Sequence, residues 1–217
     1  MADRPAAVLA FFHDIVAGRE AEFEEWFQHE HLPERIAMPG FVIGRRYEAV
    51  SVDRGYFHFY VVRSVEDLKS DAYAARVNEP TLLTRTVMSE ITKNVFRTVC
   101  RRVYQRGAMH GGAAVTVRLA SRSVKAKLRT AIEELIRDRA VASGEIWEGV
   151  DPDEFSVSTE ERLRGGDRRL ATCLLLETLR VPEAEKIAVA LANSFQAADI
   201  GVYRFLCQIA ASEQPSQ

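Results

Sequence analysis

The sequence predicts an α+β protein in which one β-α-β-β-α-β unit is followed by a second. The same order of strand-like and helix-like segments occurs twice in the 217 residues. A glycine-containing stretch, 106–112, separates the two passes. Strand-like runs such as Tyr56-Phe57-His58-Phe59-Tyr60 carry apolar or aromatic side chains on both faces. Such a sheet must be covered on both sides, by helices on one face and a second sheet on the other.

Hydrophobic periodicity places the individual elements. The first pass is expected to contain a strand over 7–13, a helix over 20–36, strands over 41–50 and 56–62, a helical stretch from 65 to about 89, and a strand over 93–104. The second pass is expected to contain a strand over 114–119, a helix over 123–142, strands over 145–150 and 170–179, a helix over 182–195, and a strand over 200–209.

The first helix carries the most distinctive pattern. Phe23, Trp26, Phe27 and Glu30 follow the i, i+3, i+4, i+7 spacing of one helix face, so they predict a buried aromatic stripe that ends in a carboxylate. His31 flanks that stripe. A buried carboxylate or imidazole needs a partner or shifts its pKa. Either Glu30 and His31 satisfy each other structurally, or they form the polar end of an apolar pocket.

Composition indicates an ordinary globular chain. Apolar residues make up 47% and charged residues 28%, and the net charge of −2 gives no general attraction to nucleic acid or membranes. Cys100, Cys173 and Cys207 are widely spaced within apolar runs, which indicates reduced core cysteines. Neither a signal peptide nor a membrane-spanning run is apparent, so the expected location is the cytoplasm.

A resemblance to a known group rests on four motifs. They are Trp26, His29-Glu30-His31-Leu32-Pro33-Glu34-Arg35, Pro39-Gly40-Phe41 and Arg46-Tyr47-Glu48. On these motifs the chain resembles the dimeric α/β-barrel superfamily, in its EthD-like branch; muconolactone isomerases and cofactor-free antibiotic-biosynthesis monooxygenases belong to the same superfamily. The match covers roughly residues 5–105. Over 113–211 only the element order and the apolar pattern agree.

The resemblance implies two tandem ferredoxin-like repeats in one chain, whose antiparallel sheets pack face to face as a pseudo-dimeric α/β barrel. The expected division is a first repeat over 1–106 with the pocket, a linker over 107–112, a degenerate second repeat over 113–211 and a disordered tail over 212–217. It also implies isomerase, lyase or cofactor-independent oxygenase chemistry. Because many activities share this fold, it does not select among them.

The leading functional hypothesis is proton transfer on a hydrophobic or aromatic substrate without metal or organic cofactor. His31 is the expected general acid or base, because imidazole titrates near working pH. Glu30 or Tyr47 would orient His31. Arg46 or Arg35 would stabilise developing negative charge, although structural ion pairing is an equal alternative.

The expected apolar walls of the pocket are Trp26, Phe27 and one face of the third strand. Tyr56, His58 and Tyr60 alternate along that strand and therefore share a face. This trio either lines a cavity or forms a hydrogen-bonded core cluster.

Metal and haem sites are not expected. His29 and His31 point to nearly opposite sides of a helix, so they cannot chelate one ion; a mononuclear site would need His31 with His58 or His13 and a carboxylate. Tandem chains of the chlorite-dismutase kind hold haem through a histidine in the second half, and here no histidine follows His110.

The segment 93–129 contains ten Lys or Arg residues and no Asp or Glu. It either binds an anionic ligand or polyanion, or pairs with acidic patches elsewhere. No phosphate loop or RNA-binding motif accompanies it, so nucleic acid is not an expected partner.

The expected partner is one small hydrophobic molecule per chain. In the second half Leu128, Ala131, Ile132 and Leu135 form a plain apolar stripe that closes the space a pocket would need. A non-catalytic ligand-binding or interaction protein of the same fold is the alternative function. A homodimer of such chains is also an expectation.

Overall fold

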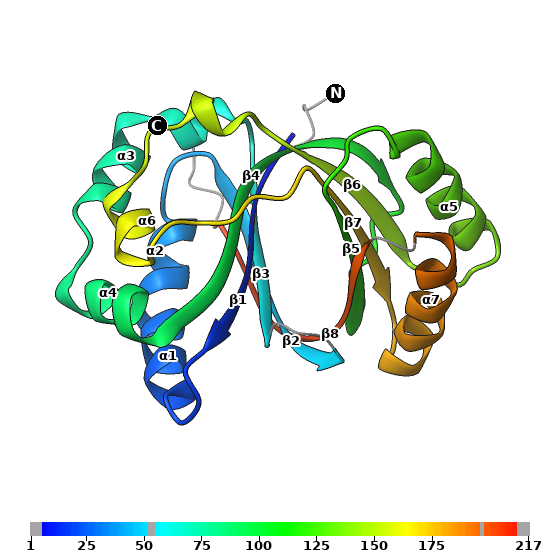
Figure 1. The fold of residues 1–217 in the computed structure, drawn as a ribbon, viewed down its shortest axis with the longest axis horizontal. Helices are drawn as coiled ribbons and strands as arrows, with labels where there is room; N and C mark the ends of the chain where they lie inside the picture. Colours follow the sequence, from blue (N-terminus) through cyan, green and yellow to red (C-terminus); the bar gives the residue numbers. More distant parts are fainter. Residues whose placement is uncertain (1–5, 52–54, 196–197, 212–217) are drawn as a thin grey trace.

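The computed structural model describes residues 6–51, 55–195 and 198–211; the expected disordered tail, 212–217, lies outside them. In these residues the strands form one closed barrel in the order β1-β3-β2-β8-β5-β7-β6-β4, and neighbouring strands run antiparallel. Helices cover the barrel on two opposite sides (Figure 1). The predicted fold class, a pseudo-dimeric ferredoxin-like α/β barrel, is confirmed.

The elements of both halves lie close to their expected positions. The first half contains β1 (Ala7–Ile15), α1 (Glu20–Trp26), η1 (Phe27–His31), α2 (Leu32–Ile36), β2 (Phe41–Ser51), β3 (Tyr56–Val62), η2 (Glu66–Lys69), α3 (Asp71–Asn78), α4 (Leu82–Thr86), η3 (Val87–Ile91) and β4 (Thr92–Arg106). The second contains β5 (Ala113–Leu119), α5 (Lys125–Arg137), β6 (Ser143–Gly149), η4 (Pro152–Glu154), α6 (Thr159–Leu163), β7 (Thr172–Thr178), α7 (Val181–Ser194) and β8 (Asp199–Ala210).

The two halves have the same strand order. In the first half the fourth strand in sequence lies beside the first, followed by the third and the second: β4-β1-β3-β2. In the second half the corresponding order is β8-β5-β7-β6. The sheets join at β2 with β8 and at β4 with β6, so the second strand of each half pairs with the fourth strand of the other. The division into domains at the linker stays a prediction.

Three apolar clusters follow from this arrangement. The barrel interior is filled from both sheets, with Phe57 and Phe59 of the first half against Trp147 and Tyr203 of the second. A second cluster lies between the first sheet and its helices, and a third lies between the second sheet and α5 and α7. Both faces of each sheet are therefore buried, as the doubly apolar strands predict.

The first helix continues through Pro33 to Ile36 and contains a π-helical turn. The backbone N–H of Leu32 donates to the carbonyl of Phe27, five residues back, which widens the helix at η1. Because of this turn, His31 is buried at 2% exposure, while Glu30 lies at the margin of the buried face. The expectation that Glu30 ends the buried stripe is therefore wrong, and His31 takes that place. Gly40 then turns the chain into β2 with a left-handed φ of +87°.

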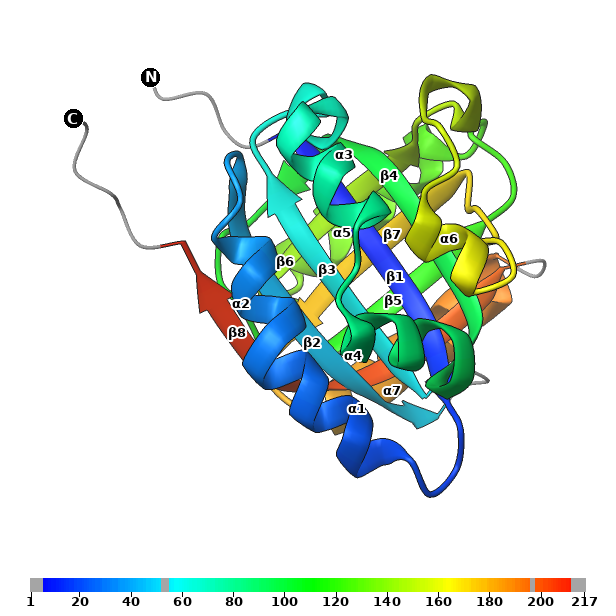
Figure 2. The same ribbon diagram turned by 90° about the vertical axis from the view of Figure 1, so that its left-hand side faces the viewer.

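The connection between β6 and β7, residues 150–171, is an element that periodicity did not predict. In the first half the corresponding connection runs only from Ser51 to Tyr56. The long connection crosses to the first half, where α6 packs beside α3 (Figures 1 and 2). Thr159 donates its backbone N–H to Asn78 at 2.9 Å, and Lys69 pairs with Glu154 at 2.7 Å.

Within the described residues, no helix combines the length and apolar character that crossing a membrane requires.

Candidate functional site

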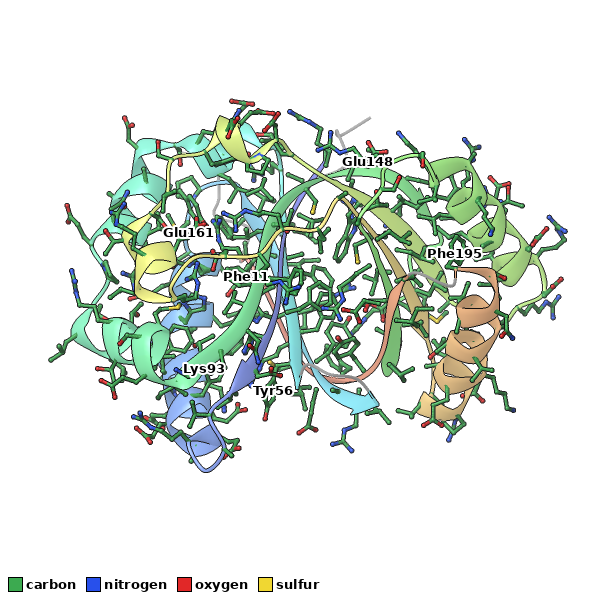
Figure 3. The ribbon with its side chains drawn as sticks, in the orientation of Figure 1. Phe11, Tyr56, Lys93, Glu148, Glu161 and Phe195 are labelled. Atoms are coloured by element: carbon green, nitrogen blue, oxygen red, sulfur yellow. The ribbon has the colours of Figure 1, made fainter. Side chains whose placement is uncertain are left out.

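A cavity lies between the first-half sheet and its helices. Its polar lining residues are His13, His31, His58, Thr92 and Arg164, and its apolar lining residues are Phe11, Phe23, Trp26, Met88 and Val95. Phe11 is labelled in Figure 3, which shows the side chains of this layer. The empty space of the cavity, including the part open to solvent, measures about 260 Å³. Its enclosed inner part has room for about one water molecule.

Trp26 is held by a chain of hydrogen bonds. Its indole Nε1 donates to the Thr84 hydroxyl at 2.9 Å, and that hydroxyl donates to Glu30 at 2.6 Å. Glu30 also accepts a hydrogen bond from Thr81 at 2.5 Å. Glu30 therefore positions Trp26 through Thr84, and its hydrogen bonds in the described residues go to these threonines rather than to His31. Neither the expected Glu30–His31 pair nor direct orientation of His31 by Glu30 is present.

The three lining histidines form a row. His58 is central: its ring stacks on Phe11 with centroids 4.6 Å apart, and it lies 5.2 Å from the His13 ring and 6.4 Å from the His31 ring. His31 packs against Trp26 at 4.3 Å, because the π-helical turn brings residues five apart onto one face. The helix, β1 and β3 each supply one imidazole.

Most ring nitrogens of this row lack a hydrogen-bond partner. Among the described residues, His13 Nε2, His31 Nδ1 and both nitrogens of His58 are buried and unpartnered. His13 Nδ1 lies 3.3 Å from the Asp14 carbonyl oxygen. A carbonyl only accepts, so Nδ1 carries the proton and Nε2 presents a lone pair.

All three imidazoles are neutral at physiological pH. Burial, followed by the charge of Arg46, lowers the pKa of His13 to about 3. Burial also lowers the pKa of His31 well below its ordinary value, aided by Arg35, and that of His58, aided by His13 and Arg46. Removal from water disfavours the imidazolium form, and nearby guanidinium groups add to that effect.

The two predicted arginines, Arg46 and Arg35, both form ion pairs beside the cavity. Arg46 Nη1 and Nη2 donate to Glu24 at 2.5 and 2.8 Å, while its guanidinium lies within 4.9 Å of the ring centroids of Phe23, Phe27 and Tyr56. Arg35 Nη2 donates to Glu160 of the long connection at 2.5 Å, and both side chains are buried. The structure therefore gives both arginines structural ion pairs beside the cavity.

Tyr56, His58 and Tyr60 share the helix-facing side of β3, as predicted. Tyr60 is buried with an unpartnered hydroxyl, and its ring centroid lies 6.3 Å from that of His31. Tyr56 is half-buried and stacks near His13 at 5.7 Å. Of the three, His58 lines the cavity and the tyrosines pack around it.

Tyr47 lies on the other face of the sheet. Its hydroxyl donates to Glu177 at 2.7 Å inside the barrel, where Glu177 also accepts from Arg45 at 3.3 Å and from the Gly111 backbone at 3.1 Å. His110 Nδ1 lies 3.1 Å from the same carboxylate. The hypothesis that Tyr47 orients His31 is therefore wrong: alternation places Arg46 and Tyr47 on opposite faces, and only Arg46 faces the helices.

Sequence reasoning did not assign Arg164 or Met88 to the site, and it considered His13 only as a metal ligand. Arg164 comes from the second half, so no pattern in the first half signals it. His13 could have been found by alternation, because it shares the helix-facing side of β1 with Phe11.

The residues do not fit a metal or a haem. Among the described residues, no group of three or more His, Cys, Asp or Glu side chains is arranged to hold a metal ion. In the second half, Leu128 and Ile132 are fully buried against β-strand side chains, and no histidine is available there as an axial ligand.

Part of the basic segment 93–129 is paired with acidic residues of the second half. Arg102 binds Glu145 at 3.0 Å, Arg118 binds Asp199 at 2.6 Å and Lys125 binds Glu148 at 2.7 Å. These pairs favour the structural interpretation of this charge cluster over a polyanion surface.

Comparison with known proteins identifies the architecture. No family model and no curated protein matches the chain. Among solved structures, an anthrone oxidase-like protein matches over 98% of this chain and 95% of its own, with a TM-score of 0.64 and 13% identity. The shared fold is a closed, ferredoxin-like α/β barrel.

Two further structures support the same fold. A candidate monooxygenase from Fusobacterium nucleatum covers 94% of each chain with a TM-score of 0.58 and 7% identity. One from Lactobacillus acidophilus covers 95% of this chain and 97% of its own, with a TM-score of 0.55 and 8% identity. Because the overlap covers nearly the whole of each chain, these structures share the two-halved barrel within one chain.

Proposed function

We propose that this protein is a cofactor-independent enzyme that moves a proton on a small, hydrophobic, ring-containing molecule. The observation that carries the proposal is the row of neutral imidazoles, His13, His58 and His31, with unpartnered nitrogens around an aromatic cavity. A structural histidine is normally hydrogen-bonded when buried. Groups left without partners are available to a ligand.

His58 and His31 are the proposed acid–base pair. Each presents a buried nitrogen with a free lone pair or N–H, and each is held by aromatic packing on one side. Neutral imidazole is the form that accepts a proton, and negative charge that develops on a bound substrate beside it favours the imidazolium and so raises the basicity of the imidazole. Arg46 and Arg35 raise the local positive potential, which favours negative charge developing on the substrate.

Loss of a proton from carbon begins isomerase, lyase and cofactor-free monooxygenase reactions alike. The names of the similar structures, anthrone oxidase-like and candidate monooxygenase, favour the oxygenase class among these. Because the inner part of the cavity has room for about one water molecule, a ring of the substrate can enter only when lining side chains move.

The test measures proton transfer without needing the natural substrate. The protein is incubated in D2O with 2-indanone, a weak carbon acid with one aromatic ring, and exchange at its acidic carbon is followed by proton NMR. We expect exchange above the buffer rate. His31→Phe and His58→Phe keep a ring in each position and should each slow the catalysed exchange by about 100-fold, the usual share of a general acid or base.

His29→Ala is the matched control, because His29 lies on the same helix with an exposed side chain. It should leave exchange unchanged. Catalysed exchange that survives both phenylalanine variants would exclude this pair from the chemistry.

A non-catalytic ligand-binding role is the second candidate, because the unpartnered histidine nitrogens could hold a ligand without any proton transfer. It predicts that 2-indanone or a related ring compound binds at the cavity without any exchange above the buffer rate.

A further inference from the structure

The long connection between β6 and β7 carries a charged group from the second half into the first-half cavity. Arg164, just after α6, has a side chain of 0% exposure and lines the cavity beside the histidines. Figure 2 shows α6 against the helical side of the first half. The connection is fastened there by the buried pair of Arg35 and Glu160.

The contacts of Arg164 fix its orientation and leave one donor weakly satisfied. Nε and Nη2 donate to the two oxygens of Asp167 at 2.7 and 2.5 Å, which is a bidentate pair with a fixed direction. Nη1 lies 3.2 Å from the Met88 sulfur and 3.9 Å from Glu160. A thioether is a weak acceptor, and Met88 is itself a cavity residue. A strong N–H donor is therefore available at the cavity wall.

The charges around the cavity leave an excess of cations. Arg46 is paired with Glu24, Arg35 with Glu160 and Arg164 with Asp167. Arg97 is also buried; its guanidinium donates to the Tyr73 hydroxyl at 2.8 Å, and no carboxylate of the described residues lies within 4 Å of it. Since the lining histidines are uncharged, the field in the cavity is positive and favours an anion over a cation.

We propose that Arg164 is the anion-binding residue of this cavity and that the ligand is a one-ring weak acid, held as its conjugate anion between Arg164 Nη1 and the histidine row. The inference rests on the site of the proposed function and names its substrate class. When the acid enters, its O–H or C–H bond breaks, the proton joins an imidazole nitrogen, and the electron pair stays on the ligand. No oxidant or reductant takes part in this step.

The second half would thus complete a site whose other charged and aromatic groups come from the first half. Met88 is unbranched and flexible, so its movement can widen the narrow inner space for a ring. The anion would then replace the sulfur as the acceptor for Nη1.

The probe for the test is 4-nitrophenol, whose phenolate absorbs visible light and whose phenol does not. Titration of the protein, followed by absorbance, reports both stoichiometry and the protonation state of the bound probe. We expect one site per chain and a bound probe that is phenolate at pH values where the free probe is still largely phenol. Nitrobenzene, an uncharged ring of similar size, measures binding that does not depend on charge.

The variant is the double substitution Arg164→Gln with Asp167→Asn, which removes both members of the pair and leaves no unpaired buried carboxylate. Arg169, which also lies 3.7 Å from Asp167, keeps its pair with Glu161. It should weaken phenolate binding by about tenfold or more, the usual effect of losing a hydrogen bond to a charged group. Nitrobenzene affinity should not change. Arg162→Gln is the control. Arg162 lies on α6, is exposed, and donates a hydrogen bond to the carbonyl of Val157 just before the helix.

Unchanged phenolate affinity in the double variant would overturn the inference, as would a wild-type protein that binds the probe only as phenol or does not bind it. These outcomes are separate from the exchange test with His31 and His58. If exchange depends on the histidines but phenolate affinity does not depend on Arg164, only the assignment of Arg164 is wrong.

Discussion

Several single residues of this protein bury polar atoms that have no hydrogen-bond partner among the described residues. A buried polar atom without a hydrogen-bond partner costs about 1–3 kcal/mol. His13, His31 and His58 carry several such atoms within one cavity. Outside the cavity, His110 pairs one ring nitrogen with Glu177, although its Nε2 is also buried without a partner. The cavity differs in gathering several such imidazole nitrogens around one space.

The histidine row should make the protein sensitive to acid. The pKa of His13 is lowered to about 3 in the folded state and lies at 6.5 in the unfolded chain, so the unfolded chain binds more protons between these values. Stability is therefore fully present above 6.5 and is lost as pH falls below it. Titration of one such histidine lowers the free energy of unfolding by about 2 kcal/mol at about pH 5. Urea denaturation at neutral pH and near pH 5 measures this loss.

His13→Phe should make the loss of stability between neutral pH and pH 5 smaller by about 2 kcal/mol, since the new ring does not titrate. His29→Ala changes an exposed imidazole and should leave the pH dependence as it is in the wild type. An equal loss for wild type and His13→Phe would show that His13 does not titrate as its burial requires.

Of the ten residues that line the cavity, the sequence identified three as site residues, Trp26, His31 and His58. Trp26 and His58 line it because helix spacing and strand alternation are local rules that the fold preserves, whereas Phe27 packs beside the cavity against His58. Alternation also separates Arg46 from Tyr47, yet it cannot say which face meets the helices; the closed barrel decides that.

Secondary-structure elements explain the remaining differences. The π-helical turn exchanges the expected places of Glu30 and His31, because an inserted residue shifts every later side chain on the helix. The long connection over 150–171 has no periodic pattern and makes its contacts far from its own half. Its position depends on tertiary contacts such as Arg35 with Glu160, which sequence spacing does not reveal.

The π-helical turn should be coupled to Pro33. Proline within a regular helix clashes with the carbonyl four residues earlier and costs about 3 kcal/mol. Here the wide turn over Phe27–His31 directly precedes Pro33. Deleting the exposed Gln28 should convert the turn to a regular helix, keep His31 beneath Trp26, and cost about 3 kcal/mol through the Pro33 clash. Thermal and urea denaturation followed by circular dichroism measure this cost.

Pro33→Ala in the deletion variant should recover most of that stability, whereas Pro33→Ala alone should have a small effect. A deletion that costs nothing, or one that alanine does not rescue, would show that the π-helical turn has another cause.

At the scale of the whole molecule, neither half can bury its own sheet. The inner face of the first sheet packs on Trp147 and Tyr203 of the second, and the barrel closes only through the β2–β8 and β4–β6 pairs. In addition, Arg35 pairs with Glu160 of the connection over 150–171, and Arg164 of that connection lines the cavity beside the histidines. Two half-barrels are thus mutually dependent, even though each has a complete strand order of its own.

A chain divided at the exposed Met109 should therefore reassemble from its two pieces. Co-produced fragments 1–108 and 109–217 should form a complex with one copy of each, detectable by light scattering and native mass spectrometry. The first fragment alone should precipitate or self-associate, because it exposes an apolar sheet face and two unpaired strand edges. The mixed complex should be preferred over self-association, since only the second fragment supplies Glu160 to the buried Arg35.

A first fragment that is monomeric and folded, or that stays self-associated when the second is present, would contradict the mutual dependence of the two halves. The same light-scattering measurement on the intact chain tests the expected homodimer.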